Sequence, residues 1–488
     1  MSLPSRSSRT DGLAIFAVAA FGLAVATTLA LDRVGAPDGL VRGAAPVLVL
    51  VGFATIGMGA HNADLASFLA ARRGLHPFYG ALTVAAAAAG MTLSLDPELG
   101  RSPNPPFLAW AAGVALGAAG LAPLVRRFGA TWPSDVIATR FPIAPLRIAF
   151  AAPVWTTAAL TAFAGYRSAV TAVAPLVASN RAWGEAIVAI VIAMCVTPGG
   201  LAGVVWCGAA GAATIAIVAI VGAASAWGMG APIAAAAVRF SMPAALTSPY
   251  SQAAAAALLA VASFFALEPA AMATRNAWSA VKSGFGGAAL WTGFAVAGGI
   301  CVTAFAIGPG PSASNPVVAS LAAAAMLASA LTLACVGVHG TARAFGLALA
   351  APREPFPTLA SVRLARMRAA QLIAVIACAV IDSRGLLEPQ TALTLALALS
   401  LAVTLPLLGL AAIGRAGPAS AAAAMAVALG AGYARLGASP LSIPGRGLIE
   451  TAAFVAGVAF VAGALVSLIA PRRGPPPTPG PFDPFASG

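Results

Sequence analysis

Long uninterrupted blocks of apolar residues dominate this chain and restrict the folds open to it. Many blocks reach 18 residues or more, which is the length of a helix that crosses the hydrocarbon core of a bilayer. Of the 488 residues, 60% are hydrophobic and only 8% are charged, whereas a soluble domain carries about 25% charged residues. The composition argues against a soluble enzyme, a secreted disulfide scaffold and a disordered protein. It predicts an all-α polytopic membrane protein.

Helix-breaking residues divide the apolar sequence into about fourteen predicted transmembrane spans. Basic residues precede the first span, as in a signal peptide, but no small-residue cleavage site follows it, which favours a retained helix. The longest predicted inside loop, 341–368, is either an amphipathic surface helix or a plain loop. The predicted spans are 12–31, 44–60, 77–95, 107–125, 145–178, 184–198, 201–227, 252–270, 285–308, 317–340, 369–386, 390–412, 418–436 and 448–470.

The arginines indicate how these spans cross the membrane. The chain has 27 basic residues and a net charge of +13. With the N-terminus in the cytoplasm, 18 of them fall on the predicted inside segments and eight on the outside segments. Cytoplasmic loops are enriched in this way. We therefore expect both termini to be cytoplasmic, in a bacterial-type inner membrane. No continuous basic stripe is present, which argues against nucleic-acid binding.

Few residues carry an obvious chemistry. The sequence has no motif typical of metalloproteases, P-loop enzymes or serine hydrolases, so we expect neither an enzyme nor a resident cofactor. Its five cysteines lie inside apolar blocks without a CxxC pair and suggest buried small side chains. For His339, near the predicted inside end of a helix, hydrogen bonding is favoured over cofactor ligation. Arg167, placed midway along the fifth span, suggests an anion-facing charge, an internal ion pair or a snorkelling side chain.

Several short motifs resemble those of the sodium:solute symporter family. The segment 126–141 carries a basic-Gly stretch, Thr131, Asp135 and the pair Arg140–Phe141, as in a cytoplasmic loop of that family, although Thr131 stands one residue early. The segment 67–75, SFLAARRGL, is similar to the family's FLAGR motif before the first core helix. Gly199–Trp206 is similar to its GG turn, and 275–282 to a basic loop. The order of the motifs extends over roughly 61–412, closest to the acetate or monocarboxylate branch.

The resemblance implies two inverted repeats of five helices each. A substrate site would then lie near the midplane, where the first helix of each repeat, 77–95 and 252–270, is broken or loosened. The implied division is 1–76 with two extra N-terminal helices, 77–227 as the first repeat, 252–412 as the second, 418–470 with two C-terminal helices, and 471–488 as a flexible cytoplasmic tail.

The same resemblance implies a sodium site between the first and eighth core helices. Its ligands would be the hydroxyls of Ser329 and Thr332 and the backbone carbonyls of Ala85 and Ala88. Alanine and leucine replace several polar residues of the family pattern here, which thins the polar lining of this site. The predicted substrate-cavity residues are Thr83, Thr92, Arg167 and Glu268.

The sequence and the family resemblance lead to two functional hypotheses from different classes. The first is a sodium-coupled secondary transporter of a small anionic or monocarboxylate solute, working by alternating access in the lipid bilayer. The second is a symporter-like subunit that no longer transports and that scaffolds or regulates a larger inner-membrane complex with partner membrane subunits. The loss of hydroxyls from the implied sodium site motivates the second.

Overall fold

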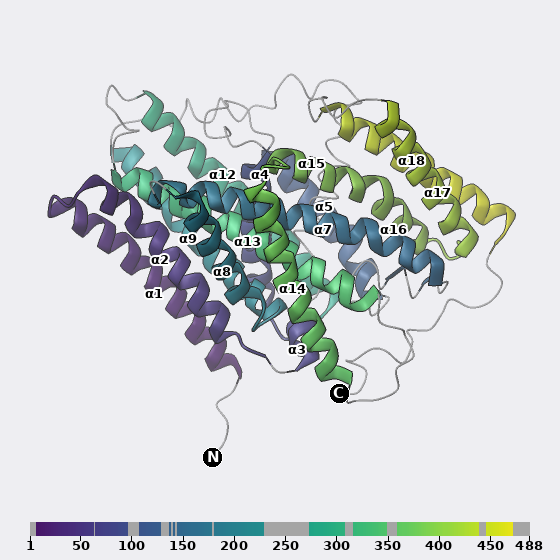
Figure 1. Cartoon of the computed structure of the whole chain (residues 1–488), viewed down its shortest axis with the longest axis horizontal. Helices are drawn as coiled ribbons and strands as arrows, with labels where there is room; N and C mark the ends of the chain where they lie inside the picture. Colours follow the sequence, from purple (N-terminus) through teal and green to yellow (C-terminus); the bar gives the residue numbers. More distant parts are fainter. Residues whose placement is uncertain are drawn as a thin grey trace, which may run out of the picture.

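The computed structural model shows a bundle of long, tilted helices (Figure 1). Within the part of the chain that the structure describes, the only β-structure is an isolated bridge between Leu75 and Thr274. The described residues are 6–62, 64–95, 107–127, 136–137, 140–141, 144–177, 180–228, 273–307, 316–348, 359–438 and 446–471.

The helices follow the apolar blocks of the sequence. Short 3-10 turns follow α3 and α7, and a π-helical turn, η5 (Ser400–Thr404), joins α15 to α16. The helices are α1 (Arg6–Arg33), α2 (Asp38–Gly59), α3 (Leu65–Ala70), α4 (Pro77–Leu95), α5 (Phe107–Arg127), α7 (Ala144–Val173), α8 (Arg181–Val196), α9 (Leu201–Gly228), α12 (Ala277–Ile307), α13 (Pro316–Ala348), α14 (Leu359–Ser383), α15 (Pro389–Leu399), α16 (Leu405–Ala412), α17 (Pro418–Ala438) and α18 (Arg446–Ile469).

Six segments among the described residues are long and apolar enough to cross a bilayer. They confirm a multi-pass membrane protein. The count of fourteen spans stays a prediction, and the predicted span 252–270 lies outside the described residues. The six segments are Asp38–Gly59, Ile148–Val173, Leu201–Gly222, Pro316–Ala344, Ser361–Ser383 and Pro389–Ala412.

Proline sets the start of several helices. Pro77, Pro316, Pro389 and Pro418 are the first residues of α4, α13, α15 and α17. Proline suits this position because its fixed φ is helical and its missing N–H would have no intrahelical partner there. The predicted starts at these four points, 77, 317, 390 and 418, lie within one residue of the observed ones.

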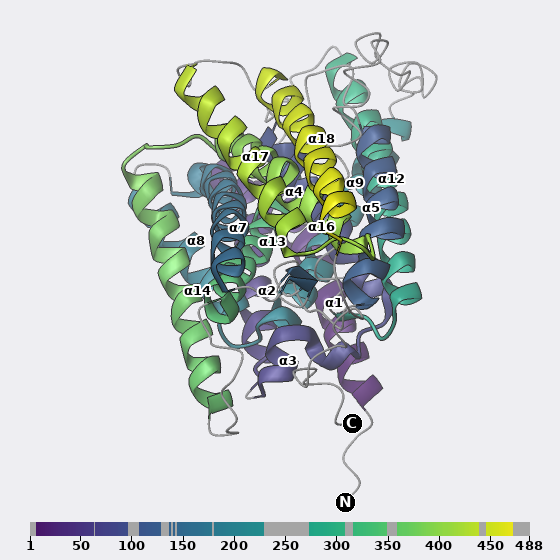
Figure 2. The ribbon, with the colours of Figure 1, turned by 90° about the vertical axis from the view of Figure 1, so that its right-hand side faces the viewer.

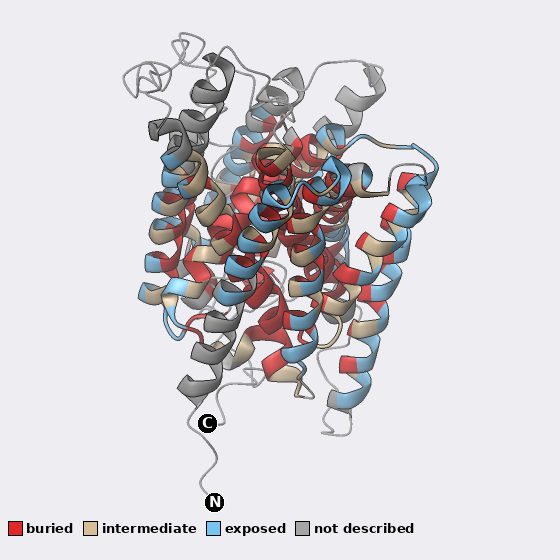
Figure 3. Cartoon of the chain, turned by 90° about the vertical axis from the view of Figure 1, so that its left-hand side faces the viewer, coloured by how far each residue is buried: buried red, intermediate tan, exposed pale blue. Residues whose placement is uncertain are grey.

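Helix α13 forms the centre of the bundle. It packs against α2, α4, α7, α9 and α14. Buried residues fill the interior of the bundle, and exposed residues lie on its outer helices (Figure 3). Glycine permits the closest approaches. A Cβ added to Gly165 of α7 would clash with the backbone of Ala334 in α13, and a Cβ added to Gly337 of α13 would clash with the backbone of Ala162 in α7. Small residues let helix backbones touch in this way.

The helix pairs α1–α2 and α17–α18 lie at opposite edges of the bundle (Figures 1 and 2). Between them, α12 packs against both α4 and α5, and α7, α8, α13 and α14 form a second group. The two groups meet where α4 contacts α13. This contact is where the sequence places the sodium ligands.

Three sequence expectations need correction. The predicted inside loop 341–368 is largely helical, because α13 continues to Ala348 and α14 begins at Leu359. His339 consequently lies within α13 rather than at its end. The fifth span, 145–178, ends earlier, because α7 stops at Val173 and a 3-10 turn follows. Hydropathy marks only the lipid-facing length of a helix, so it misses polar helical extensions.

Candidate functional site

The predicted sodium ligands lie on two helices that are in direct backbone contact. Ala85 and Ala88 of α4 and Ser329 and Thr332 of α13 are all buried. A Cβ added to Gly90 of α4 would lie 2.5 Å from the carbonyl oxygen of Ser329. The structure therefore brings together the two helix segments that the resemblance names, with no space for a side chain between the backbones at this point.

Both hydroxyls of α13 donate their hydrogen to their own helix. Ser329 Oγ donates to the carbonyl of Met326 at 2.8 Å, and Thr332 Oγ1 donates to that of Ala328 at 2.8 Å. Each hydroxyl keeps oxygen lone pairs with which to bind a cation. A Cβ added to Gly211 of α9 would lie 2.7 Å from Thr332 Oγ1. Glycine at this position of α9 thus lets its backbone pack directly against the Thr332 hydroxyl, which is fully buried.

The expected break in the first core helix is wrong for 77–95. Helix α4 is continuous from Pro77 to Leu95, and its alanine run, Ala85–Ala89, is buried. Alanine has the strongest helix propensity, so this run favours an unbroken helix. The carbonyl of Ala88 accepts a hydrogen bond from Thr92 Oγ1 at 2.6 Å. In this conformation a predicted sodium ligand thus has a partner within the helix.

The predicted cavity residues Thr83 and Thr92 lie in packed interfaces. Thr83 Oγ1 is 2.9 Å from the carbonyl of Tyr79 and 3.1 Å from that of Val205 in α9. A Cβ added to Gly208 of α9 would lie 2.6 Å from Thr83 Cγ2. Thr83 therefore ties α4 to α9 in this conformation. Glu268 lies outside the described residues.

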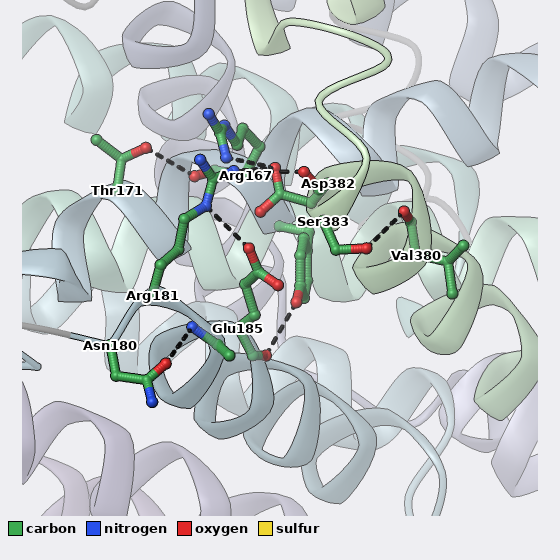
Figure 4. A network of polar contacts seen from close by, with 10 residues as sticks. Arg167, Thr171, Asn180, Arg181, Glu185, Val380, Asp382 and Ser383 are labelled. Carbon is green, nitrogen blue, oxygen red and sulfur yellow. Dashed lines mark hydrogen bonds and ion pairs between the residues drawn. The ribbon is translucent and has the colours of Figure 1, made fainter.

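Arg167 belongs to a charged cluster that joins three helices (Figure 4). Its Nη1 is 2.6 Å from Oδ1 of Asp382, near the end of α14. Arg181, the first residue of α8, places Nη2 3.2 Å from the same oxygen and Nε 2.9 Å from Oε1 of Glu185. The hydroxyl of Tyr166 donates to the carbonyl of Glu185 at 2.9 Å. The cluster links α7, α8 and α14.

Of the three roles that the sequence suggests for Arg167, the structure shows the internal ion pair, with Asp382 as the partner. The residue lies six positions before the end of α7 rather than midway along its span. Glu185, Glu268 and Asp382 stand near the ends of their predicted spans in the sequence, so the sequence alone gave no reason to prefer one of them as partner.

Two of the family-like motifs meet in space. Phe68, from the FLAGR-like segment, lies against Gly200 of the GG turn, which has φ +57°. The guanidinium of Arg368 in α14 lies 5.8 Å from the centre of the Phe68 ring, and its Nη2 donates to the carbonyl of Asn62 at 2.6 Å. The turn can approach Phe68 only because a glycine stands at 200.

Arg140, from a third motif, closes the end of another helix. Its side chain is buried, and it donates hydrogen bonds to three carbonyls at the end of α16, those of Ala411, Ile413 and Gly414, at 3.3, 2.9 and 2.8 Å. The last carbonyls of a helix lack intrahelical donors, and a cation is favoured beside them. The Asp135 of this motif lies outside the described residues.

Solved structures of symporters share this fold. No protein-family model matches the chain, and no curated protein matches its sequence. The substrate-bound outward-open state of a Na⁺-coupled sialic acid symporter aligns with a TM-score of 0.68 and 14% identity, over 89% of this chain and 98% of that one. A nucleobase-cation-symport-1 family transporter, closed with bromovinylhydantoin bound, aligns with a TM-score of 0.54 and 15% identity, over 84% of this chain and 97% of that one.

At these identities the likeness shows the fold alone. The chain has the fold of known sodium-coupled symporters, which confirms the sequence resemblance at that level. These structural neighbours are secondary transporters rather than enzymes. The acetate or monocarboxylate branch and the five-plus-five repeat stay predictions.

Proposed function

We propose that this protein is a sodium-coupled secondary transporter of a small anionic solute of the monocarboxylate type. The observation that carries the proposal is the extent of the fold match, which takes in 89% of this chain and 98% of a Na⁺-coupled symporter. The motifs that resemble the sodium:solute symporter family lie within the same bundle. The solute class comes from the resemblance to the monocarboxylate branch.

The α4–α13 contact supports an alternating-access mechanism. Two groups of helices meet there, α4, α5 and α12 on one side and α7, α8, α13 and α14 on the other. We call the α4–α13 contact the seam. Gly90 places no side chain between the two backbones there, so the helices can separate or slide at low steric cost. Sodium would bind when the seam opens, on the hydroxyls of Ser329 and Thr332 and on carbonyls of Ala85 and Ala88, because a hard cation prefers oxygen ligands.

The domain division belongs to the same proposal. We take 77–227 and 252–412 as the two inverted repeats, preceded by two extra helices in 1–76 and followed by two in 418–470 and a cytoplasmic tail in 471–488. We place the protein in a bacterial-type inner membrane; the arginine distribution supports the orientation with both termini in the cytoplasm. Thr83, Thr92, Arg167 and Glu268 are the residues we assign to the substrate path.

Uptake into proteoliposomes tests this function. Purified protein should accumulate a radiolabelled short-chain monocarboxylate when sodium is high outside, and less when choline replaces sodium. Thr332→Val removes one proposed ligand and should abolish the sodium dependence. Thr341→Val, at another buried threonine of α13 that also bonds its own helix, is the matched control. Uptake equal to that of protein-free vesicles for every solute tested would refute transport.

The continuous α4 motivates the second candidate function. A symporter-like subunit that no longer transports could keep the α4–α13 contact closed permanently and act as a scaffold in a larger complex. Gentle purification from native membranes separates the two functions. Stoichiometric partner subunits together with absent uptake would favour the scaffold, and sodium-dependent uptake by the lone chain would exclude it.

A further inference from the structure

The segment Pro389–Ala412 contains a helix defect with an identifiable cause. Helices α15 and α16 are joined by the π-helical turn η5, in which the amide of Leu405 donates to the carbonyl of Ser400, five residues back. Pro406 lies two residues after the end of η5 and has no N–H to donate. Proline inside a helix and π-helical turns are recognised causes of such local distortions.

The defect leaves a backbone carbonyl without its usual donors. In an α-helix the carbonyl of Leu401 would accept from the amide of Leu405, but this amide bonds to Ser400 instead. In a π-helix it would accept from residue 406, which is proline. The carbonyl of Leu401 therefore has neither its α-helical nor its π-helical donor. Buried carbonyls without any partner are uncommon in folded proteins.

Two buried hydroxyls on the same turn are also without partners. Ser400 and Thr404 are 1% and 3% exposed, and neither hydroxyl has a hydrogen-bond partner among the described residues. Thr394, in the same segment, shows the usual alternative, since its hydroxyl donates to the carbonyl of Gln390 at 2.7 Å. The corresponding carbonyl for Thr404 is that of Ser400, to which the amide of Leu405 donates but the Thr404 hydroxyl does not.

Two unpartnered hydroxyls and a carbonyl that lacks both of its regular helical donors thus lie within one turn, in the interior of the protein. The turn η5 packs against α7, α17 and α18; α15 packs against α7 and α18, and α16 against α17 and α18 (Figure 1). A buried polar atom without a partner is costly, so two such hydroxyls beside this carbonyl indicate a bound group that satisfies them.

The chemistry of the turn favours a cation over a neutral group. The oxygens come from two hydroxyls and a carbonyl, which are ligands for hard metal ions. Carbonyls freed at the ends of half-helices bind sodium in other membrane proteins. The segment from 389 to 412 contains no acidic residue, which disfavours a divalent ion. We propose that Ser400 Oγ, Thr404 Oγ1 and the carbonyl of Leu401 bind a monovalent cation.

This site is distinct from the one at α4 and α13, and it does not depend on the proposed function. A chain that does not transport could hold the cation as a structural ion, and a transporter could hold it in addition to its coupling ion. The test therefore measures binding rather than uptake.

The double variant Ser400→Ala/Thr404→Val removes both hydroxyls at nearly constant shape. It deletes buried groups that lack protein partners, which is close to neutral for folding. Thr394→Val, which removes a hydroxyl that already has a partner, is the matched control. Radioactive sodium and, separately, radioactive rubidium are bound to the purified proteins in detergent, and the bound ions per chain are counted in the presence of choline chloride.

We expect the double variant to bind one cation fewer per chain than the parent protein, and Thr394→Val to bind as many as the parent. Adding Thr332→Val to the parent should leave the ion that depends on Ser400 and Thr404 in place, which separates this site from the one at α13. Sodium or rubidium should raise the melting temperature of the parent more than that of the double variant. Equal binding of both tracers by the parent and the double variant, as for a turn filled by water, overturns the proposal.

Discussion

The ion pair between Arg167 and Asp382 offers a direct measurement of what holds α7 and α14 together. The change Asp382→Asn keeps the size of the side chain and one oxygen acceptor but removes the negative charge. Arg167 and Arg181 then lose their shared negative partner, since Asp382 Oδ1 lies 2.6 Å from Arg167 Nη1 and 3.2 Å from Arg181 Nη2. The expected result is a less stable protein with an unchanged fold.

The exposed fractions of the three side chains set the size of the effect. Asp382 is 1% exposed, Arg167 27% and Arg181 52%. Breaking a fully buried pair by removing one partner costs about 3–5 kcal/mol, whereas an exposed pair contributes about 0.2–1 kcal/mol. Because water reaches both arginines, we expect Asp382→Asn to lower the free energy of unfolding by about 2 kcal/mol. Arg181→Gln should lower it by about 0.5 kcal/mol.

Reversible denaturation in detergent micelles, followed by tryptophan fluorescence, measures these differences. A double-mutant cycle with Arg167→Gln should give a coupling energy with Asp382 of about 1–2 kcal/mol. The reasoning fails if Asp382→Asn is no less stable than Arg181→Gln, or if the coupling energy is zero. Either result would mean that the cluster is a solvated surface network.

Three further changes test other parts of the structure. Gly200→Ala should destabilise the protein by about 2 kcal/mol or more in thermal melting, because the αL conformation costs about 1–2 kcal/mol and the new Cβ meets the backbone of Phe68. Gly385→Ala, at φ +61° but with open space around it, should show the conformational cost alone. Gly90→Val should prevent α4 and α13 from closing on each other and should abolish sodium-dependent uptake. Gly52→Val should be tolerated, because a Cβ at Gly52 would have nothing within 4 Å. Equal uptake by the two variants would contradict a role for the α4–α13 contact in transport. Arg140→Gln should cost about 2–4 kcal/mol, because three carbonyls at the end of α16 lose charged donors; a wild-type melting temperature would show that this cap contributes nothing.

The sequence predicts the apolar helices best where a breaker coincides with the membrane boundary. The predicted spans 107–125 and 418–436 differ from α5 and α17 by two residues at one end. The sequence analysis missed α3, because six residues are too few to show a hydropathy signal. It shortened α13 and α14, because their ends carry arginines and lie beyond the apolar windows.

The candidate sites were predictable only in part. The resemblance correctly named two helices that touch, α4 and α13, because motif order fixes which segments correspond. It gave the wrong expectation for α4, where the local preference of alanine for helix prevails. Hydropathy could not select Asp382 as the partner of Arg167, since contact between distant segments depends on packing. The π-helical turn left only one sequence signal, Pro406.

The contact between Phe68 and Gly200 has a consequence for the evolution of this protein. A turn residue, an aromatic ring and the arginine stacked on that ring belong to segments separated by more than a hundred residues in the chain. A Cβ at 200 would meet the backbone carbonyl oxygen of Phe68 as well as its ring. Every residue at 68 carries that oxygen, so a smaller side chain at 68 would not make room for a side chain at 200. In an alignment of relatives that keep this turn, position 200 should therefore stay glycine whichever residue stands at 68, and Arg368 should persist through its hydrogen bonds to the carbonyls of Asn62 and Pro198.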